Sequence, residues 1–295
     1  MRVAAVEKEL FLRLMALKQW PLRAKIAVKY RHGLDLSVDG VQQPIFISTA
    51  TKGLFPSHMV VASDELDILL NKPVDSLVWL MPEALDAHRD DGTLTLSHRL
   101  FDLRLRFAFD GEVDAIRLGQ TVSRYRSLLT FVATCGGLAP LEEIFSPSWA
   151  YRAAFDLIPE TKATICSLLG CGVGSTPAGD DMLVGAASAC HVVSSLSDNV
   201  GERAQQWLRV LGECQPQFEQ RTTLMSCGYL NAALTGRFGS HLIGLHQSFF
   251  GLRQMRLLTA MMKVKRHGST SGVDALVGVY LGYRMLTKFS NAEYS

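Results

Sequence analysis

Hydrophobic and polar residues follow two different periods along this chain. At the start, the apolar residues between Val3 and Leu17 recur every three or four positions, which predicts a short amphipathic helix. From residue 24 to about residue 110 the period is mostly two, which predicts strands. The predicted strands cover residues 24–30, 34–38, 45–49, 59–62, 76–81, 93–97 and 103–109. Short strands at this spacing predict a small antiparallel barrel or sandwich.

Beyond about residue 112, helical spacing replaces the alternation, and Gly, Ser, Pro and Asn separate the helical segments. We therefore predict an α+β protein with two domains. A β-rich domain with a leading helix covers residues 1–112, and a mostly α-helical domain covers residues 113–295. The predicted helices of the second domain cover residues 119–132, 147–155, 160–169, 180–193, 202–211, 217–234, 239–253 and 273–286.

Composition limits the classes of protein that this chain can belong to. It has 295 residues, of which 48% are hydrophobic, so disorder is excluded. A formal net charge of +2 argues against a protein that binds nucleic acid through phosphate contacts. Residues 1–150 carry 17 basic and 18 acidic side chains, and the rest of the chain carries 13 and 10. The lower charge density predicts that the second half is the more buried one.

Cysteines and apolar segments predict the compartment. The six cysteines are scattered without a C-x-x-C pair, so we expect neither a disulfide nor a zinc site. The first twenty residues mix charges among apolar positions, so they contain no signal-peptide core. The longest apolar run, residues 182–193, is too short and too mixed to span a bilayer. We expect a cytoplasmic protein that does not bind membranes.

One sequence pattern occurs twice in the helical half. The segment GSTPAGDDMLVG, from Gly174 to Gly185, recurs as GSTSGVDALVG, from Gly268 to Gly278, once Pro177 is skipped. Each copy consists of a Gly/Ser/Thr loop, an acidic residue and an apolar helix. Recurrence by chance is improbable at this length, although two copies do not make a solenoid. The repeat therefore predicts two related structures.

Each copy has the features of a helix N-terminus. Thr176 is a suitable N-cap and Pro177 a suitable first helical residue, while Asp180, Asp181 and Asp274 fall in first turns, where a carboxylate interacts favourably with the helix dipole. A structural interpretation is two capped helices that pack through their glycines. A functional interpretation is an anion-binding nest, because clustered glycines expose N–H groups and capping needs only one hydroxyl or acid. The duplication favours the second interpretation.

Carboxylates beside an anion site need an explanation, because they repel phosphate or another carboxylate. They could hold Mg²⁺ that bridges to the anion, pair with an arginine, or accept hydrogen bonds from substrate NH₂ groups. The sequence does not choose among the three, and it identifies no other cofactor. The candidate counter-charges are Arg221, Arg237 and Arg266.

Two further features lie near the repeat. Thr222, Ser226 and Tyr229 would share one face of the helix predicted over residues 217–234. That face could bind a ligand or simply form hydrogen bonds to neighbouring helices. His267 directly precedes the second loop, next to the basic residues 263–266, which could attract an anion.

The two loops also resemble a known family. LGCGVGSTPAGDD, residues 169–181, is similar to the GxGxGLTPSGDD segment of the AllH-like family, which is typified by a subunit of oxamate carbamoyltransferase. HGSTSGVD, residues 267–274, is similar to the family's GHTSGxD segment, and residues 226–238 resemble an intervening stretch. The resemblance covers about residues 125–286. Ser175 stands where the family usually has Leu, and Ala178 where it usually has Ser.

The resemblance implies a role in purine or allantoin catabolism, as one subunit of a multi-subunit complex that moves a carbamoyl group between phosphate and the nitrogen of oxamate. One loop would hold phosphate or carbamoyl phosphate, and the other the oxamate carboxylate. The predicted catalytic residues are Asp181, Asp274 and Asp180. The predicted substrate-binding residues are Gly172, Gly174, Ser175, Thr176, Gly179, Arg221, Ser226, Tyr229, His267, Gly268, Ser269, Thr270, Ser271 and Gly272.

Two other functions are compatible with the sequence. One is a non-catalytic subunit that binds a ligand or stabilises an assembly. The other is a metal-dependent amide hydrolase that acts on ureido compounds. The expected partners of the chain are a small anionic metabolite and the other subunits of a carbamoyltransferase complex, and self-association of the chain is left open.

Overall fold

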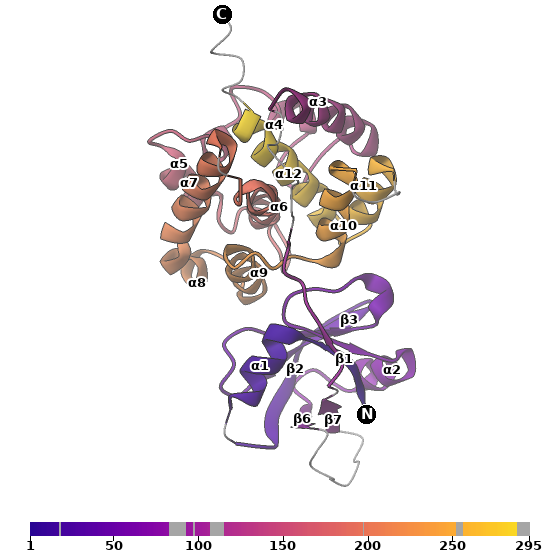
Figure 1. The fold of residues 1–295 in the computed structure, drawn as a ribbon. Coiled ribbons are helices and arrows are strands. Elements are labelled where there is room, and N and C mark those ends of the chain that lie inside the picture. The colour runs from indigo at the N-terminus through magenta and orange to yellow at the C-terminus, as the bar shows by residue number, and fades with distance from the viewer. Residues whose placement is uncertain are drawn as a thin grey trace, which may run out of the picture. The chain divides into compact units, whose positions relative to one another are not determined.

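A computed structural model describes residues 1–17, 19–82, 93–96, 98–106, 115–196, 198–251 and 256–287. The chain forms two compact units, Met1–Leu103 and Arg104–Ser295, and each is described by itself below. The first contains a β-sheet and the second is helical (Figure 1), so the predicted α+β class is confirmed. The domain ranges 1–112 and 113–295 stay a prediction.

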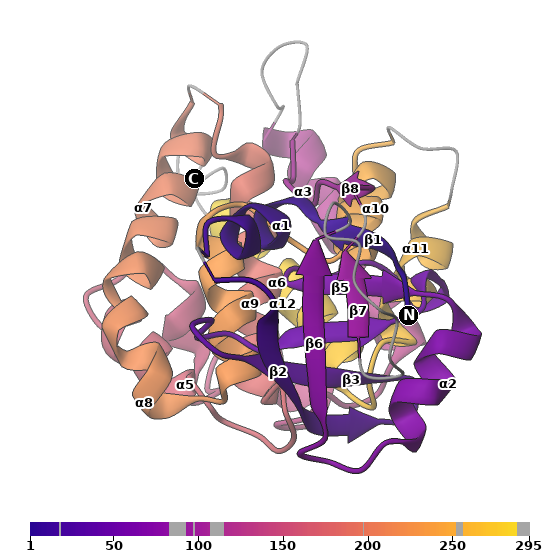
Figure 2. The ribbon, with the colours of Figure 1, turned by 90° about the horizontal axis from the view of Figure 1, so that it is seen from below.

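The first unit is built on one sheet of eight strands in the order β7-β6-β2-β3-β4-β5-β1-β8. The sheet curls, as Figure 2 shows for β6 and β7 against β2 and β3. Its edge strand β7 returns to the beginning of the chain, where the Thr95 N–H donates to the Met1 carbonyl at 2.9 Å. The strands are β1 (Val3–Glu7), β2 (Leu22–Tyr30), β3 (Gly33–Val38), β4 (Ile45–Ser48), β5 (His58–Val61), β6 (Leu77–Pro82), β7 (Thr93–Leu96) and β8 (Leu100–Phe101).

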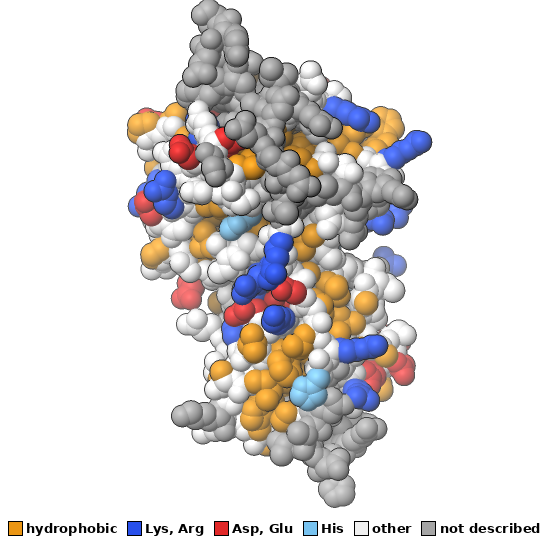
Figure 3. Space-filling view, in the orientation of Figure 1, with side chains coloured by type: hydrophobic (Ala, Val, Ile, Leu, Met, Phe, Trp, Pro, Cys, Tyr) orange, Lys and Arg blue, Asp and Glu red, His pale blue; other side chains and the backbone are white. Residues whose placement is uncertain are grey.

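Two helices and a 3₁₀ turn accompany the sheet: α1 (Lys8–Met15), α2 (Ser63–Asn71) and η1 (Ala50–Lys52). Leu10 and Leu14 of α1 are fully buried in the same core as Ile26, Leu36 and Ile47 of the strands. Hydrophobic side chains also gather on the surface of this unit (Figure 3). Leu12, which is 52% exposed, lies on the outer face of α1.

The sheet differs from the predicted one in pairing and at its ends. Three neighbouring pairs, β1–β8, β4–β5 and β6–β7, are parallel, so the prediction of an antiparallel sheet was only partly right. The predicted helix over residues 3–17 begins at Lys8, because the Glu7 carboxylate accepts the Leu10 N–H at 2.8 Å and caps the helix there. The residues before it form β1.

The last predicted strand, residues 103–109, is not a strand over its described part. The Leu105 N–H donates instead to the Gly236 carbonyl of the helical unit at 2.8 Å. Residues 107–109 lie outside the described residues. Helix α2 was not predicted, although Asp64 and Glu65 in its first turn are typical of a helix N-terminus.

The helical unit is arranged around two helices, α6 (Ala178–Val193) and α12 (Ser271–Thr287), which lie at its centre (Figure 1). The remaining elements are α3 (Ala115–Val132), α4 (Leu141–Ile144), η2 (Arg152–Phe155), α5 (Thr161–Leu168), α7 (Asn199–Glu213), η3 (Gln215–Gln217), α8 (Phe218–Arg221), α9 (Leu224–Leu234), α10 (Ser240–Phe249) and α11 (Leu257–Lys265). No helix among the described residues is long and apolar enough to cross a membrane.

Most predicted helices of this unit are present, with four differences. Of residues 147–155 only η2 is helical, and neither α4 nor α11 was predicted. The helix predicted over residues 217–234 is broken at Thr222 and Thr223, because the Thr223 side chain accepts the Ser226 N–H and caps α9. Thr222 therefore does not share a helical face with Ser226 and Tyr229.

Helices α6 and α12 approach each other backbone to backbone. A methyl group on Gly185 would overlap the Ala275 carbonyl oxygen, and one on Gly278 would overlap the Met182 carbonyl oxygen. Gly185 and Gly278 are equivalent in the repeat, and so are Met182 and Ala275. Replacing each residue by its equivalent in the other copy turns the first contact into the second. Helices α6 and α12 are therefore related by a local pseudo-twofold axis.

A buried polar chain lies beside this helix pair. Ser188 Oγ donates to the Gly185 carbonyl at 2.6 Å, so it accepts from His246 Nε2 at 2.8 Å, and His246 Nδ1 accepts from the Tyr283 hydroxyl at 2.8 Å. Burial lowers the pKa of His246 to about 3 and raises the pKa of Tyr283. All three side chains are fully buried, so this polar chain of hydrogen bonds is part of the core of the helical unit.

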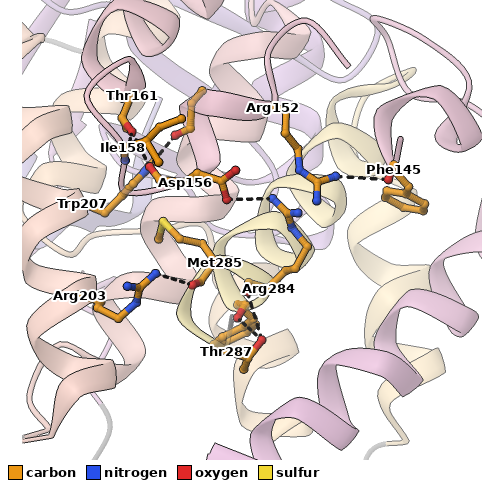
Figure 4. Close-up of polar contacts among 12 residues, drawn as sticks. Phe145, Arg152, Asp156, Ile158, Thr161, Arg203, Trp207, Arg284, Met285 and Thr287 are labelled. Atoms are coloured by element: carbon orange, nitrogen blue, oxygen red, sulfur yellow. Dashed lines mark hydrogen bonds and ion pairs between the residues drawn. The ribbon is translucent and has the colours of Figure 1, made fainter. Parts of the chain in front are cut away.

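The C-terminal part of α12 is anchored by a charged cluster (Figure 4). Arg284 lies 3.3 Å from Asp156, and each side chain is 12% exposed. Arg203 of α7 donates to the Met285 carbonyl at 3.0 Å. These bonds join α12 to α7 and to the chain after η2.

We expect Gly278→Ala to destabilise the protein by about 1–3 kcal/mol, because the new methyl group overlaps a backbone carbonyl that cannot move freely. Urea unfolding of both variants measures the effect. Gly119→Ala in α3 is the matched control, since no atom of the described residues outside its own helix backbone lies within 4 Å of the added methyl group. There alanine should stabilise the helix by about 0.5–1 kcal/mol. Equal effects at the two positions would contradict the packing described above.

Candidate functional site

The two loops of the repeat meet in the structure. The Thr176 hydroxyl, at the end of the loop before α6, lies 2.9 Å from the Ser271 hydroxyl, at the beginning of α12. The close packing of α6 on α12 brings their N-termini together, and with them Asp181 and Asp274 of the first turns. The two copies of the repeat are thus in direct contact.

The loops are built alike, although the first is longer. The Gly179 N–H donates to the Cys171 carbonyl, and the equivalent Gly272 N–H donates to the His267 carbonyl, both at 2.9 Å. The bonded residues are therefore three positions further apart in the first loop than in the second. Its residues Gly172 and Gly174 have φ of 114° and 99°, which favours glycine. Both loops are open to solvent; the exposed residues are Gly172, Val173, Gly174, Ser175, Gly268, Ser269 and Thr270.

Thr176 is not the N-cap of α6. Pro177 occupies the cap position and makes no side-chain cap bond, and the helix begins at Ala178. The predicted cap was wrong because the Thr176 hydroxyl contacts Ser271 of the other copy instead of an N–H of its own helix. The hydroxyl thereby connects the two copies.

Asp180 joins the first loop to α9. Its carboxylate accepts the Gly170 N–H at 2.9 Å and the Thr222 hydroxyl. Burial raises the pKa of Asp180, and the donors Thr222, Gly170 and Ser226 oppose the rise. These contacts indicate a positioning role, and a catalytic role of Asp180 stays a prediction. Thr222 thus contacts Asp180 although it lies before the first turn of α9.

Asp181 lies between the two loops. Burial raises its pKa well above the ordinary value, and the charges of Asp274 and Asp180 raise it further, while the hydroxyls of Ser271 and Thr176 lower it. Its Oδ2 atom is buried and has no hydrogen-bond partner among the described residues. We therefore expect the Asp181–Asp274 pair to hold a proton near neutral pH, because two close buried carboxylates resist ionising together.

Asp274 is fully buried, and burial raises its pKa to about 6. The Gly137 N–H, which donates to Oδ1 at 2.7 Å, and the nearby Thr270 hydroxyl oppose the rise. Its Oδ2 atom meets no hydrogen-bond partner among the described residues. Each acid of the pair thus has one oxygen that the described part of the protein leaves unsatisfied.

Sequence reasoning missed Gly136 and Gly137, which bring the turn after α3 against Asp274. A side chain at Gly136 would place its Cβ 2.7 Å from Asp274 Oδ1. The adjacent glycines were the available signal, but nothing local connects them with a repeat that begins almost forty residues later. Contacts of this kind depend on the tertiary structure.

The arginines proposed as counter-charges lie elsewhere. Arg221 donates to Gln217 Oε1 at 2.9 Å and to the Cys166 carbonyl at 3.1 Å, and Arg237 donates to Thr235 at 3.1 Å. Arg266 is exposed at the end of α11. Among the described residues, no arginine shifts the pKa of Asp181 or Asp274. Pairing with an arginine therefore has no support here.

The other predicted residues border the loops. His267 packs against His241 with 4.9 Å between ring centroids, and burial lowers its pKa to about 4, so it is neutral at pH 7. Its carbonyl shapes the second loop. Ser175 accepts a hydrogen bond from Thr223 through its carbonyl, which holds the first loop against α9. Tyr229 is half-buried on α9.

The site offers few groups for a metal. No group of three or more His, Cys, Asp or Glu side chains in the described part of the chain could hold a metal ion. Asp181, Asp274 and the surrounding hydroxyls could supply two carboxylates and neutral oxygens, which suits Mg²⁺ that is also bound by a substrate phosphate.

The two loop–helix copies, joined at their N-termini, form a candidate ligand site on a duplicated helical scaffold. The sequence model of the family described as oxamate carbamoyltransferase subunit AllH matches residues 168–283, which include both loops and α6 and most of α12. The resemblance to the AllH-like family is thus confirmed over this part of the chain. No solved structure matches the chain.

We expect Asp274→Asn to stabilise the protein at neutral pH. The folded pKa of about 6 exceeds the ordinary 3.8, so ionisation costs stability as pH rises from about 4 to about 6. At pH 7 the variant should gain up to about 3 kcal/mol, and below pH 4 the gain should vanish. Unfolding in urea across this pH range measures it.

The exposed Asp67 of α2 provides the control, because Asp67→Asn makes the same replacement of a carboxylate by an amide at the protein surface. A lower stability of Asp274→Asn at pH 7 would contradict the unfavourable burial of this charge.

Proposed function

We propose that this chain is a subunit of a carbamoyltransferase-type enzyme and binds small anions between the N-termini of α6 and α12. The observation that carries the proposal is the Thr176–Ser271 contact, which joins two exposed, glycine-rich loops at one place. The N–H groups of such loops and the positive ends of two helix dipoles favour phosphate, carbamoyl phosphate or a carboxylate. The match to the AllH family supports oxamate and carbamoyl phosphate as the first compounds to test.

The acid pair can contribute to the reaction of such ligands. A protonated carboxyl group donates a hydrogen bond to an anion oxygen, so a pair that holds a proton does not repel the ligand as two carboxylates would. The ionised member can accept a hydrogen bond from a substrate NH₂ group. A site of this kind would work by bringing two ligands together and by stabilising charge in the tetrahedral intermediate.

Direct binding tests the site. We expect phosphate, carbamoyl phosphate or oxamate to raise the unfolding temperature, because a ligand at a hundredfold excess over Kd stabilises the folded state by about 2.7 kcal/mol. The double variant Thr176→Ala, Ser271→Ala should lose this shift. Ser127→Ala, which removes an exposed hydroxyl of α3, should keep it. No shift with any of the three anions would overturn the proposed site.

The pH and Mg²⁺ dependence separates the explanations for the acid pair. If the pair binds the anion through its proton, affinity should rise as pH falls from 7 to 5 and should not need Mg²⁺. If Mg²⁺ bridges the acids and the anion, affinity should need the metal and should fall over the same range, because the ligands must be ionised.

The assembled enzyme tests catalysis. When the partner subunits are co-purified, Asp181→Asn and Asp274→Asn should each lower carbamoyl transfer by about 10²–10³-fold without releasing the partners, if the pair stabilises the transition state. Pull-down and turnover are measured on the same preparations. Full turnover in both variants, with stable partners, would instead assign the chain a non-catalytic role in ligand binding or assembly.

A further inference from the structure

A third segment, the turn from Thr134 to Leu141, lies against both copies of the repeat. The turn is closed by two hydrogen bonds, from the Gly136 N–H to the Ala139 carbonyl at 3.0 Å and from the Leu141 N–H to the Thr134 carbonyl at 2.9 Å. From this turn the Gly137 N–H reaches Asp274 Oδ1 at 2.7 Å. The segment lies outside the part matched by the AllH family, residues 168–283.

Gly137 fits where a larger residue would not. A Cβ atom at this position would lie 2.7 Å from Ala178 Cβ, 2.9 Å from Asp274 Oδ2 and 3.0 Å from Thr270 Oγ1. Ala178 begins α6, whereas Thr270 and Asp274 belong to the second loop and α12. The glycine therefore touches both copies at once, and it is itself exposed to solvent.

The turn occupies the place where the two copies differ. In the repeat, Thr176 corresponds to Thr270, and Ser271 corresponds to Ala178. On one side of the pseudo-twofold axis the hydroxyls of Thr176 and Ser271 meet. On the other side Ala178 has no hydroxyl for Thr270, and Gly137 lies between these two residues. Asp181 is consequently surrounded by hydroxyls, and Asp274 by a fixed N–H group and one hydroxyl.

This difference gives the two acids different surroundings. A hydroxyl can donate to a carboxylate or accept from a protonated carboxyl group, so it suits both forms of Asp181. An N–H group only donates, so Gly137 favours the ionised form of Asp274. The Oδ2 atom of Asp274 is buried and lacks a hydrogen-bond partner among the described residues, which leaves it for a ligand.

We propose that Gly137 is a positioning residue of the ligand site, whose N–H group orients the Asp274 carboxylate toward a ligand NH₂ or hydroxyl group and whose missing side chain lets the turn close against both loops. The proposal rests on the proposed function, because it assigns Asp274 to ligand binding. It adds a third chain segment to the site and gives the two acids unequal roles.

A double-mutant cycle on the full chain tests the proposal, with oxamate as the probe and inorganic phosphate as the second ligand. Gly137→Ala should weaken oxamate binding at least tenfold. Asp274→Asn should weaken it too, and the double variant should bind no worse than Asp274→Asn alone, because Gly137 acts through Asp274. If the losses of oxamate affinity in the two single variants multiply in the double variant, the proposal is overturned. Wild-type oxamate affinity in Gly137→Ala would overturn it as well.

Two further variants separate positioning from loss of folding. Adding Ala178→Gly to Gly137→Ala removes the closest clash, at 2.7 Å, and should recover part of the affinity. Gly119→Ala in α3 controls for the substitution itself. Circular dichroism shows whether each variant is folded. If Gly137→Ala is unfolded and the double variant with Ala178→Gly still does not bind oxamate, the proposal is overturned.

A pH measurement without ligand completes the test. Gly137→Ala displaces the donor that stabilises ionised Asp274, so the folded-state pKa of Asp274 should rise above about 6. The loss of stability with rising pH should then continue to a higher pH than in the wild type. The titratable group that faces Asp274 from α6 is Asp181, whose own pKa the Asp274 charge raises, and it is unchanged in this variant. An unchanged pH profile overturns the positioning role. Failure of the wild type to bind oxamate or phosphate overturns the proposed function instead.

Discussion

The close approach of α6 and α12 is the constraint on which the helical unit depends. The backbones of the two helices touch at Gly185 and Gly278, where even a methyl group would overlap a carbonyl oxygen. Since the glycines are equivalent in the repeat, the contact brings the two N-termini to one place. The hydroxyl contact between the loops and the proximity of the two acids both follow from it. The same contact therefore both packs the helical unit and forms the candidate site, so the structural and functional interpretations of the repeat are compatible.

Features that depend on local periodicity could be predicted from the sequence. The α+β class, the central helices and the position of Asp181 and Asp274 in first turns followed from apolar spacing and from the duplicated motif. The parallel pairs of the sheet could not be predicted, because alternation describes a strand and not its neighbour. Thr176 satisfied the rules for an N-cap, yet a contact with the other copy directs its hydroxyl elsewhere. Gly137 could not be connected with Asp274 from spacing, because only the fold brings them together.

The acids of the site differ in how well the protein satisfies them. Asp180 has donors on both oxygens and holds the first loop against α9. Asp181 and Asp274 each keep a buried oxygen without a partner among the described residues. A buried group in that state lowers the stability of the fold, typically by about 1–3 kcal/mol. Buried polar atoms without a hydrogen-bond partner are common at sites that bind ligands, where a bound ligand can supply the missing partner.

The polar chain through Ser188, His246 and Tyr283 has a consequence for measurement. Every bond in it is made between neutral groups, and its histidine and tyrosine gain or lose protons only far from neutrality. The central helices therefore keep the same hydrogen bonds across the range in which Asp274 changes its charge. A titration near pH 6 that is followed by a probe close to α6 and α12 reports on the acids between the loops, with a constant background from the core that holds them.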